Sequence, residues 1–285
     1  MAITFRQGVA ADAAACGRIC FEAFAQIADA HNFPREFPAL EVSVGVLSMM
    51  LTHPGYYVVV AERDGEIIGS NALDERSLIA GIGPISISPT VQDCGVGREL
   101  MRRVLERAHS RGFPGVRLVQ AAYHNRSLAL YAKLGFEPRE PLSCVQGSAL
   151  NTTIAGYAVR PAVEGDLEAC NQLGFRVHGH TRAGDLRDAV AHGTATVVER
   201  DGRVTGYASV IAFYGHAVGE TNDDLQALIA AAPAFGGPGF LLPTRNGNLL
   251  RWCLGRGLRV VQAMTLMTIG LYNEPRGAYL PSVSY

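Results

Sequence analysis

The stretch that decides the fold is PTVQDCGVGR, residues 89–98. It follows a strand-like run at about residues 82–87 and opens a helix predicted to span about residues 95–111. Apolar residues recur at helical spacing and predict the buried stripe of that helix: Val96, Leu100, Val104 and Ala108. Two glycines at a helix start let the backbone approach a ligand closely, and the exposed N–H groups with the helix dipole favour a phosphate. The stretch therefore predicts a phosphate-binding loop.

Two better-known phosphate motifs do not fit this loop. Position 100 is Leu, so Gly95-Val96-Gly97 does not continue into G-x-G-x-x-G, and no Gly-Lys-Ser/Thr follows. The glycines alone leave open a purely structural role, in which they close a tight strand-to-helix turn. Cys94 lies inside the loop, where a helix N-terminus lowers a thiol pKa. We expect only the backbone of Cys94 to matter.

A second motif, NRSLALYAKLGF at residues 125–136, predicts a helix to about Leu134 with Tyr131 on it. By itself Tyr131 would be read as a core aromatic residue. Together the two motifs resemble the GNAT superfamily of N-acetyltransferases, whose patterns are Q/R-x-x-G-x-G/A and N-x-x-(A)-x-x-x-Y-x-x-x-G-F. The resemblance covers about residues 3–147 and is weak beyond them.

The resemblance implies acetyl-CoA as the co-substrate and assigns residues to its parts. Backbone groups of the strand at Ile85, Ser86 and Ile87 would pair with the pantetheine arm, and Asn125 and Ser127 would lie near that arm. The residues that would cradle the pyrophosphate are Gln92, Asp93, Cys94, Gly95, Val96, Gly97 and Arg98. Tyr131 would be the general acid for the departing thiolate.

The chemistry requires further groups. A lysine-like amine has a pKa of about 10.4, so a base must take its proton before it attacks the thioester. Asp74 and Glu75, at the end of the strand next to the cofactor strand, are the candidates for that base. The alternative is a solvated turn, Asp74-Glu75-Arg76. A backbone N–H near Ile87 could stabilise the oxyanion.

The chain also contains an internal repeat. FRQGVAAD at residues 5–12 is echoed by VRPAVEGD at 159–166, and ERDGEIIG at 62–69 by ERDGRVTG at 199–206. Asp-Gly between two apolar runs predicts a hairpin in each copy. The order of strands and helices predicts a mixed α/β (α+β) sheet flanked by helices, present as two tandem GNAT-like domains. We expect a catalytic domain over residues 1–149 and a second domain over 150–285.

The second copy lacks the phosphate loop. Its counterpart, residues 216–225, has no paired glycines and carries Glu220, Asp223 and Asp224, which favour an ordinary capped helix start. Trp252 stands where the first copy has Tyr131. We therefore expect a degenerate, cofactor-free domain that forms part of the acceptor site or of the domain interface. Four residues of the C-terminal tail could reach an acceptor: Asn273, Glu274, Arg276 and Tyr279.

Composition limits the remaining possibilities. With 48% hydrophobic residues, 18% charged residues and a net charge of −1, the chain has material for packed cores and no global field for nucleic acid. The chain has no apolar run of about 18 residues, so the sequence predicts no membrane-spanning helix. The N-terminus lacks a signal-peptide pattern, which favours a cytoplasmic protein, and neither the six cysteines nor His178 and His180 have metal-site spacing. We expect no metal.

The function predicted from these residues is transfer of the acetyl group of acetyl-CoA to a primary amine. The acceptor would be a small molecule or amino-acid-like, attacking directly in a ternary complex. The alternatives are a non-catalytic acyl-CoA-binding sensor or partner-binding protein, and transfer of a longer acyl group such as succinyl. The sequence leaves the acceptor open, and also whether the protein is a monomer or a homodimer.

Overall fold

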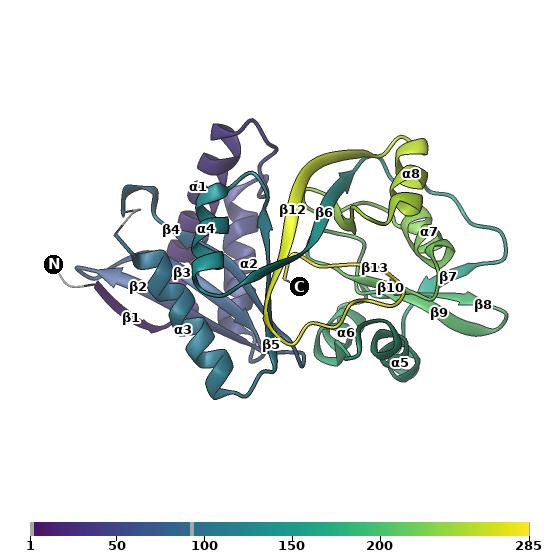
Figure 1. Cartoon of the computed structure of the whole chain (residues 1–285), viewed down its shortest axis with the longest axis horizontal. Coiled ribbons are helices and arrows are strands. Elements are labelled where there is room, and N and C mark those ends of the chain that lie inside the picture. The colour runs from purple at the N-terminus through teal and green to yellow at the C-terminus, as the bar shows by residue number, and fades with distance from the viewer. Residues whose placement is uncertain (1–2, 92–93, 285) are drawn as a thin grey trace.

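The computed structural model describes residues 3–91 and 94–284. Two β-sheets, each covered by helices, lie side by side (Figure 1). The first half contributes β1 (Ile3–Gln7), α1 (Ala13–Ala30), α2 (Leu40–Thr52), β2 (Tyr56–Arg63), β3 (Glu66–Asp74), β4 (Ala80–Ile87), α3 (Val96–Ser110), β5 (Gly115–Ala121), α4 (Asn125–Lys133) and β6 (Glu137–Gln146). The second half contributes β7 (Ala158–Pro161), α5 (Leu167–His178), α6 (Ala183–Ala191), β8 (Thr196–Arg200), β9 (Arg203–Ala208), β10 (Ala217–Gly219), α7 (Asn222–Ala231), β11 (Phe240–Pro243), α8 (Gly247–Gly255), β12 (Arg259–Gly270) and β13 (Ala278–Leu280).

The larger sheet has the strand order β1-β2-β3-β4-β5-β12-β6-β11, and the smaller one β13-β10-β9-β8-β7. Among the strands of the described residues, β4 and β5 alone pair in parallel; the other neighbours are antiparallel. The predicted mixed sheet flanked by helices is therefore confirmed. The C-terminal tail contains a short strand, β13.

The internal repeat extends to individual side-chain contacts. Arg6 donates to Asp12 at 2.7 Å and to Glu62 at 2.6 Å, and Arg160 donates to its counterparts Asp166 and Glu199 at the same two distances. In both copies this aspartate also accepts the backbone N–H three residues before it, at 2.8 Å. The two halves therefore repeat one fold in detail, as the sequence predicted.

The halves nevertheless share a sheet. Strand β12 comes from the second half but lies between β5 and β6 of the first, and it pairs with both. Strand β6 of the first half in turn pairs with β11 of the second. The division at residues 149 and 150 thus stays a proposal about the sequence repeat, because strands from both sides of it complete the larger sheet.

The helix predicted after the phosphate loop packs as expected. The four residues of its apolar stripe are all buried, and they belong to a core with the strands β2 to β5: Val96, Leu100, Val104 and Ala108. This packing fixes the N-terminus of α3 beyond the end of β4. No helix in the part of the chain that the structure describes has the length and apolar character needed to cross a bilayer.

Candidate functional site

A gap in strand pairing lies at the centre of the candidate site. Strands β4 and β5 pair only from Ala80 to Ile82, opposite Val116 to Leu118. Beyond that point β4 continues to Ile87, held on its other edge by β3. The edge of residues 83–87 that faces β5 has no strand partner among the described residues. Its backbone N–H and C=O groups can therefore pair with an extended ligand.

The three predicted strand residues lie along this gap. Ile85 and Ile87 pack against the core that contains α3, and Ser86 is buried. The hydroxyl of Ser86 has no hydrogen-bond partner in residues 3–91 and 94–284. The structure thus places Ile85, Ser86 and Ile87 beside the unpaired edge, where an extended ligand would lie.

The N-terminus of α3 follows directly in the chain. Gly95 is its N-cap, with φ of 78° and ψ of 0°, a left-handed conformation that strains other residues. No side chain of the described residues caps the helix there. The first N–H groups, like those of any helix, have no intrahelical acceptor. Cys94 and Arg98 are exposed, whereas Gly97 packs so close to Ile87 that a Cβ would lie 3.1 Å from its side chain. Gln92 and Asp93, also predicted for this loop, lie outside the described residues.

Helix α4 supplies the next predicted residues. Asn125 begins the helix and is exposed, and the Ser127 hydroxyl lies 3.0 Å from Gln120 Oε1. Tyr131 is 7% exposed, and its ring packs edge-on against Phe136 with 6.1 Å between the ring centroids. Burial raises the pKa of the Tyr131 phenol above its usual value of 10. The phenol is therefore protonated at neutral pH and able to donate.

The two predicted bases occupy unexpected surroundings. Asp74 accepts from the guanidinium of Arg76 at 2.9 and 2.6 Å, and Glu75 accepts from Arg107 at 2.7 and 3.0 Å. The side chains of Asp74 and Glu75 are only 9% and 8% exposed, so the alternative of a solvated turn is wrong. Because each carboxylate already accepts two arginine N–H groups, these contacts do not support either residue as the base.

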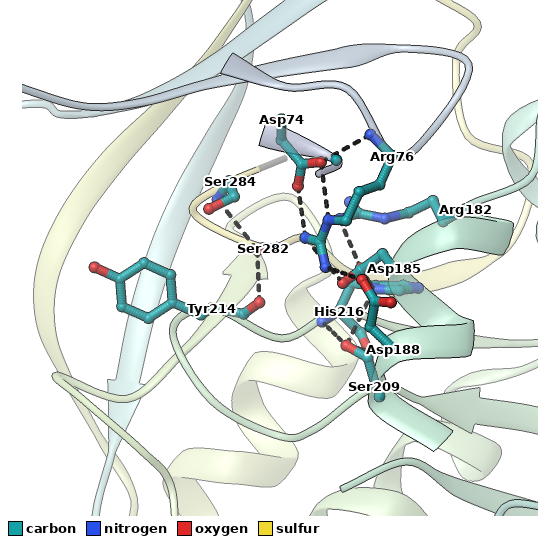
Figure 2. Close-up of polar contacts among 12 residues, drawn as sticks. Asp74, Arg76, Arg182, Asp185, Asp188, Ser209, Tyr214, His216, Ser282 and Ser284 are labelled. Atoms are coloured by element: carbon teal, nitrogen blue, oxygen red, sulfur yellow. Dashed lines mark hydrogen bonds and ion pairs between the residues drawn. The ribbon is translucent and has the colours of Figure 1, made fainter. Parts of the chain in front are cut away.

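Arg76 joins the two halves of the chain. Besides Asp74 and the Tyr56 hydroxyl, it contacts Asp188 at 2.9 Å and Asp185 at 3.3 Å, both on α6 (Figure 2). Backbone approach at this point is so close that a Cβ on Gly184 would lie 2.2 Å from the Arg76 carbonyl oxygen. Asp74 therefore belongs to an interface cluster between the halves.

A third carboxylate, which the sequence motifs do not include, has no charged partner among the described residues. Glu36, between α1 and α2, is half-buried. Burial raises the pKa of its carboxyl to about 7, and no ion pair or hydrogen bond from a described residue offsets that effect. Burial, and then the negative charge of Glu36, raise the pKa of Tyr123 and of Cys144 to about 12 each. Glu36 therefore lies near residues at the ends of β5 and β6.

Aromatic contacts fix the position of Glu36. Phe33 stacks on Tyr123 with 4.2 Å between ring centroids, and the buried Phe37 packs edge-on against Phe24 at 5.7 Å. The second half adds Tyr214, whose pKa is raised well above 10 by burial and by the charges of Cys20 and Glu36, although 36% of the residue is exposed. Glu36 lies outside both sequence motifs, so the sequence patterns gave no signal for it.

The corresponding place in the second half is closed. There β10 pairs on one edge with β9 and on the other with β13, so the chain itself occupies the edge that is unpaired in β4. Helix α7 starts with a capping box in which Asp224 accepts from the backbone N–H and the hydroxyl of Thr221, both at 2.8 Å. The predicted ordinary capped helix start is confirmed. No group of three or more metal-ligating side chains occurs within the described ranges.

Comparison with known proteins agrees with this geometry. Residues 22–136 match the family model described as "Acetyltransferase (GNAT) family". A curated relative, the uncharacterised N-acetyltransferase YjgM of Escherichia coli (strain K12), is 27% identical over 95 residues. That match covers 32% of this chain, and the chain spans only 57% of the relative's length.

Two solved structures resemble the whole chain. One is a candidate acetyltransferase from Pyrococcus horikoshii, with a TM-score of 0.76, 18% identity, and 97% of this chain and 92% of that chain covered. The other is a tandem GNAT protein from the clavulanic acid biosynthesis pathway, with a TM-score of 0.56, 15% identity, and 94% and 98% covered. At these identities the two structures establish the fold. Residues 22–136 therefore resemble the GNAT acetyltransferase family, within a chain that has the fold of a tandem GNAT protein.

Proposed function

We propose that the protein transfers the acetyl group of acetyl-CoA to a primary amine of a small or amino-acid-like acceptor. The observation that carries this proposal is the unpaired edge of β4 leading to the uncapped N-terminus of α3. An extended arm with amide groups suits the former, and a pyrophosphate suits the latter. In this arrangement the described residues of the predicted cofactor site, from Ile85 to Arg98, would follow the bound cofactor along the chain.

The reaction would proceed by direct attack in a ternary complex. Glu36, ionised above pH 7, takes a proton from the acceptor's ammonium group, directly or through water. The neutral amine then attacks the thioester carbon, a C–N bond forms, and the C–S bond breaks. Tyr131, protonated at neutral pH, gives its proton to the departing thiolate, and the second proton released by the attacking nitrogen returns through water to restore the phenol. A backbone N–H of the unpaired β4 edge would stabilise the oxyanion.

The second half would hold no cofactor. Strand β13 occupies the edge of β10, and the capped, acidic start of α7 repels phosphate. Its contribution would be the wall of the acceptor site that carries Tyr214, together with the interface around Arg76.

A thiol-release assay with acetyl-CoA and a panel of primary amines tests the proposal. We expect turnover on at least one amine, and a loss of about 10- to 1,000-fold in kcat for Tyr131→Phe with unchanged acetyl-CoA affinity. Tight acetyl-CoA binding without turnover on any amine would favour the alternative, a non-catalytic acyl-CoA sensor. Succinyl-CoA is tested with the same amines. Faster transfer from succinyl-CoA than from acetyl-CoA would mean that the protein transfers a longer acyl group.

A further inference from the structure

Three aromatic side chains that solvent can reach lie near Glu36, the proposed base. Phe33 and Tyr123 are half-buried and stack on each other, and Tyr214 is 36% exposed. Burial raises the pKa of Tyr123 and of Tyr214, and the charge of Glu36 adds to the rise in both, so its carboxylate is close to both phenols. Tyr123 follows the end of β5, where β5 has already separated from β4. These three rings, the aromatic group, therefore adjoin the proposed transfer site.

Tyr214 comes from the second half, and the chain around it is fixed. Phe213 is 1% exposed in a core with β6, β11 and β12, and its ring packs edge-on against Tyr214 at 5.9 Å. The backbone N–H of Val283 donates to the Phe213 carbonyl at 2.9 Å. The Ser282 hydroxyl donates to the Tyr214 carbonyl at 2.9 Å, while the Tyr214 ring points away from the cluster around Arg76 (Figure 2). The second half thus holds this ring in a defined place beside a site of the first half.

Glu36 carries the charge of this site. Burial alone raises the pKa of its carboxyl, so no described cation lies close enough to lower that pKa. The neighbouring Arg35 pairs with Asp29 at 2.5 Å on the surface. The exposed His31 lies against the Tyr123 ring, and it too leaves the pKa of Glu36 unaffected. A negative group on a ligand would therefore meet the charge of Glu36 without a described cation to offset it.

Arg76 and Arg126 do not supply such a cation. The Arg76 guanidinium donates to the Tyr56 hydroxyl at 2.6 Å. It also contacts three carboxylates, which more than balance its charge: Asp74, Asp185 and Asp188. The charge of Arg126, at the start of α4, lowers the pKa of His124 after burial, but it does not contribute to the pKa of Glu36. The ligand side of Glu36 is therefore aromatic and negative.

The carboxylate of an α-amino acid cannot avoid Glu36. The carboxyl carbon of such a molecule lies about 2.5 Å from its nitrogen. That nitrogen must come within about 3 Å of the base, or of one bridging water, to lose its proton. The two negative charges would then lie within about 8 Å of each other, which disfavours binding in a partly buried site. An amine without a carboxylate escapes this repulsion, and its ammonium group is attracted by the aromatic rings as well as by Glu36.

We propose that the acceptor is a primary amine on an aromatic body that carries no carboxylate, and that Tyr214 packs against that body. The inference rests on the proposed function and narrows its acceptor to the arylalkylamine class. Glu36 would face the nitrogen, and the aromatic group would contact the body of the acceptor. Sites for small molecules are typically lined in this way, by aromatic side chains and a few polar groups. The second half would thereby take part in the choice of substrate.

Three amines test the inference in acetyl transfer by the full chain at pH 8. The first is 2-phenylethylamine, the second is L-phenylalanine, which adds a carboxylate to the same body, and the third is ethylamine, which lacks the ring. We expect kcat/KM for 2-phenylethylamine to exceed the other two by about tenfold or more. Tyr214→Ala should lower it by about tenfold, mainly through a higher KM, and leave kcat/KM for ethylamine unchanged.

Two variants control for the loss of a ring. Tyr214→Phe keeps the ring and should retain the wild-type preference within about twofold. Phe175→Ala removes a ring that is 60% exposed on α5, a helix that lies away from α1 and α2 (Figure 1), and should change none of the three rates. L-Phenylalanine acetylated as efficiently as 2-phenylethylamine by the wild type would overturn the inference. An equal loss on 2-phenylethylamine and ethylamine in Tyr214→Ala would overturn it too.

Failure of the proposed function would look different, because no amine would be acetylated at all. Equilibrium titration of the full chain with 2-phenylethylamine and with L-phenylalanine then decides the inference separately. We expect tighter binding of 2-phenylethylamine, weakened by Tyr214→Ala. Glu36→Gln, which removes the negative charge, should bring the two affinities closer together. Unchanged discrimination between the two ligands in Glu36→Gln would show that Glu36 does not exclude the carboxylate.

Discussion

At the scale of single residues, a carboxylate is useful as a base only if its surroundings leave it unpaired. Asp74 and Glu75 follow the strand next to the proposed cofactor strand, but each forms an ion pair with an arginine. Glu36 has neither an ion pair nor a hydrogen bond to any residue in the described ranges, and burial alone raises its pKa to about 7. The environment rather than the residue type therefore distinguishes the structural carboxylates from the proposed catalytic one.

Replacing Glu36 by Gln tests the base directly. Because only the ionised carboxylate accepts a proton, the wild-type rate should rise with pH through about 7. The variant should lose about 100- to 10,000-fold in kcat/KM together with that pH limb. Acetyl-CoA affinity should not change. Glu41→Gln, at an exposed position in the first turn of α2, is the control. A Glu36→Gln enzyme with the wild-type rate and pH profile would remove Glu36 from the mechanism.

The same substitution should affect stability in the opposite direction. The pKa of Glu36 is higher in the folded protein, about 7, than its ordinary value of 4.5, so ionisation costs folding free energy. That cost is absent below pH 4.5, grows up to about pH 7 and then stays constant. Glu36→Gln should therefore be more stable than wild type at pH 8, by about 1 kcal/mol after solvent screening, and equal at pH 4. Urea unfolding at the two pH values measures the difference.

Arg76 is the residue on which the interface between the halves depends most. Its side chain is 13% exposed and lies among Asp74, Asp185 and Asp188 (Figure 2). Arg76→Met would leave three carboxylates without this cation, so we expect a loss of about 3–5 kcal/mol in unfolding free energy at pH 7. Arg35→Met, at an exposed surface pair with Asp29, should cost far less stability. Similar losses for both variants would contradict a special role for Arg76.

At the scale of elements, the start of α3 is the proposed anion site, whereas the start of α7 is capped by Thr221 and Asp224. Gly95→Ala would place a Cβ on a residue with φ of 78°, which costs about 1–2 kcal/mol in the left-handed region. We expect weaker acetyl-CoA binding, because the strained turn misaligns the N–H groups that face the pyrophosphate. Gly156→Ala, with φ of 82° in a turn outside the proposed site, is matched for strain. Equal acetyl-CoA affinity in both variants would argue against phosphate binding at α3.

The pairing of β13 with β10 predicts how many acetyl-CoA molecules each chain binds. Because the chain itself covers the edge of β10, calorimetry should find one acetyl-CoA per chain. Binding at two sites would mean that β13 leaves its place, and the proposal of a cofactor-free second half would fail. The sequence predicted that the second half lacks a phosphate-binding loop. It did not predict β13, because three residues between prolines and glycines carry no strand pattern of their own.

At the scale of the whole molecule, the sequence predicted the repeated fold, the packing of α3 and the likeness to the GNAT family. These features depend on local spacing, such as Asp-Gly between apolar runs or Val96, Leu100 and Val104 along one helix face. The sharing of one sheet by both halves could not be predicted in this way. The alternation of buried residues along β12 is the same whichever strands lie beside it, so its partners are set by the assembled fold.

The candidate site shows the same limit. Motifs predicted the proposed cofactor path, because it follows the chain from β4 into α3. Glu36 and Tyr214 come together from parts of the chain that are far apart in sequence. A charged residue between Arg35 and Phe37 in an irregular segment looks like surface until the packing of Phe33 and Phe37 is known. Contacts of this kind become visible only in three dimensions.

The place of β12 between β5 and β6 has a consequence for how the protein is made (Figure 1). While the ribosome is still translating, the first half has two strand edges with nothing between them until residues 259–270 have emerged. Exposed edges of this kind favour aggregation. We therefore expect residues 1–149 produced alone to be insoluble, and co-production of residues 150–285 to recover a folded complex, measurable by size-exclusion chromatography. A soluble, monomeric and folded 1–149 fragment would show that the first half folds without strand β12.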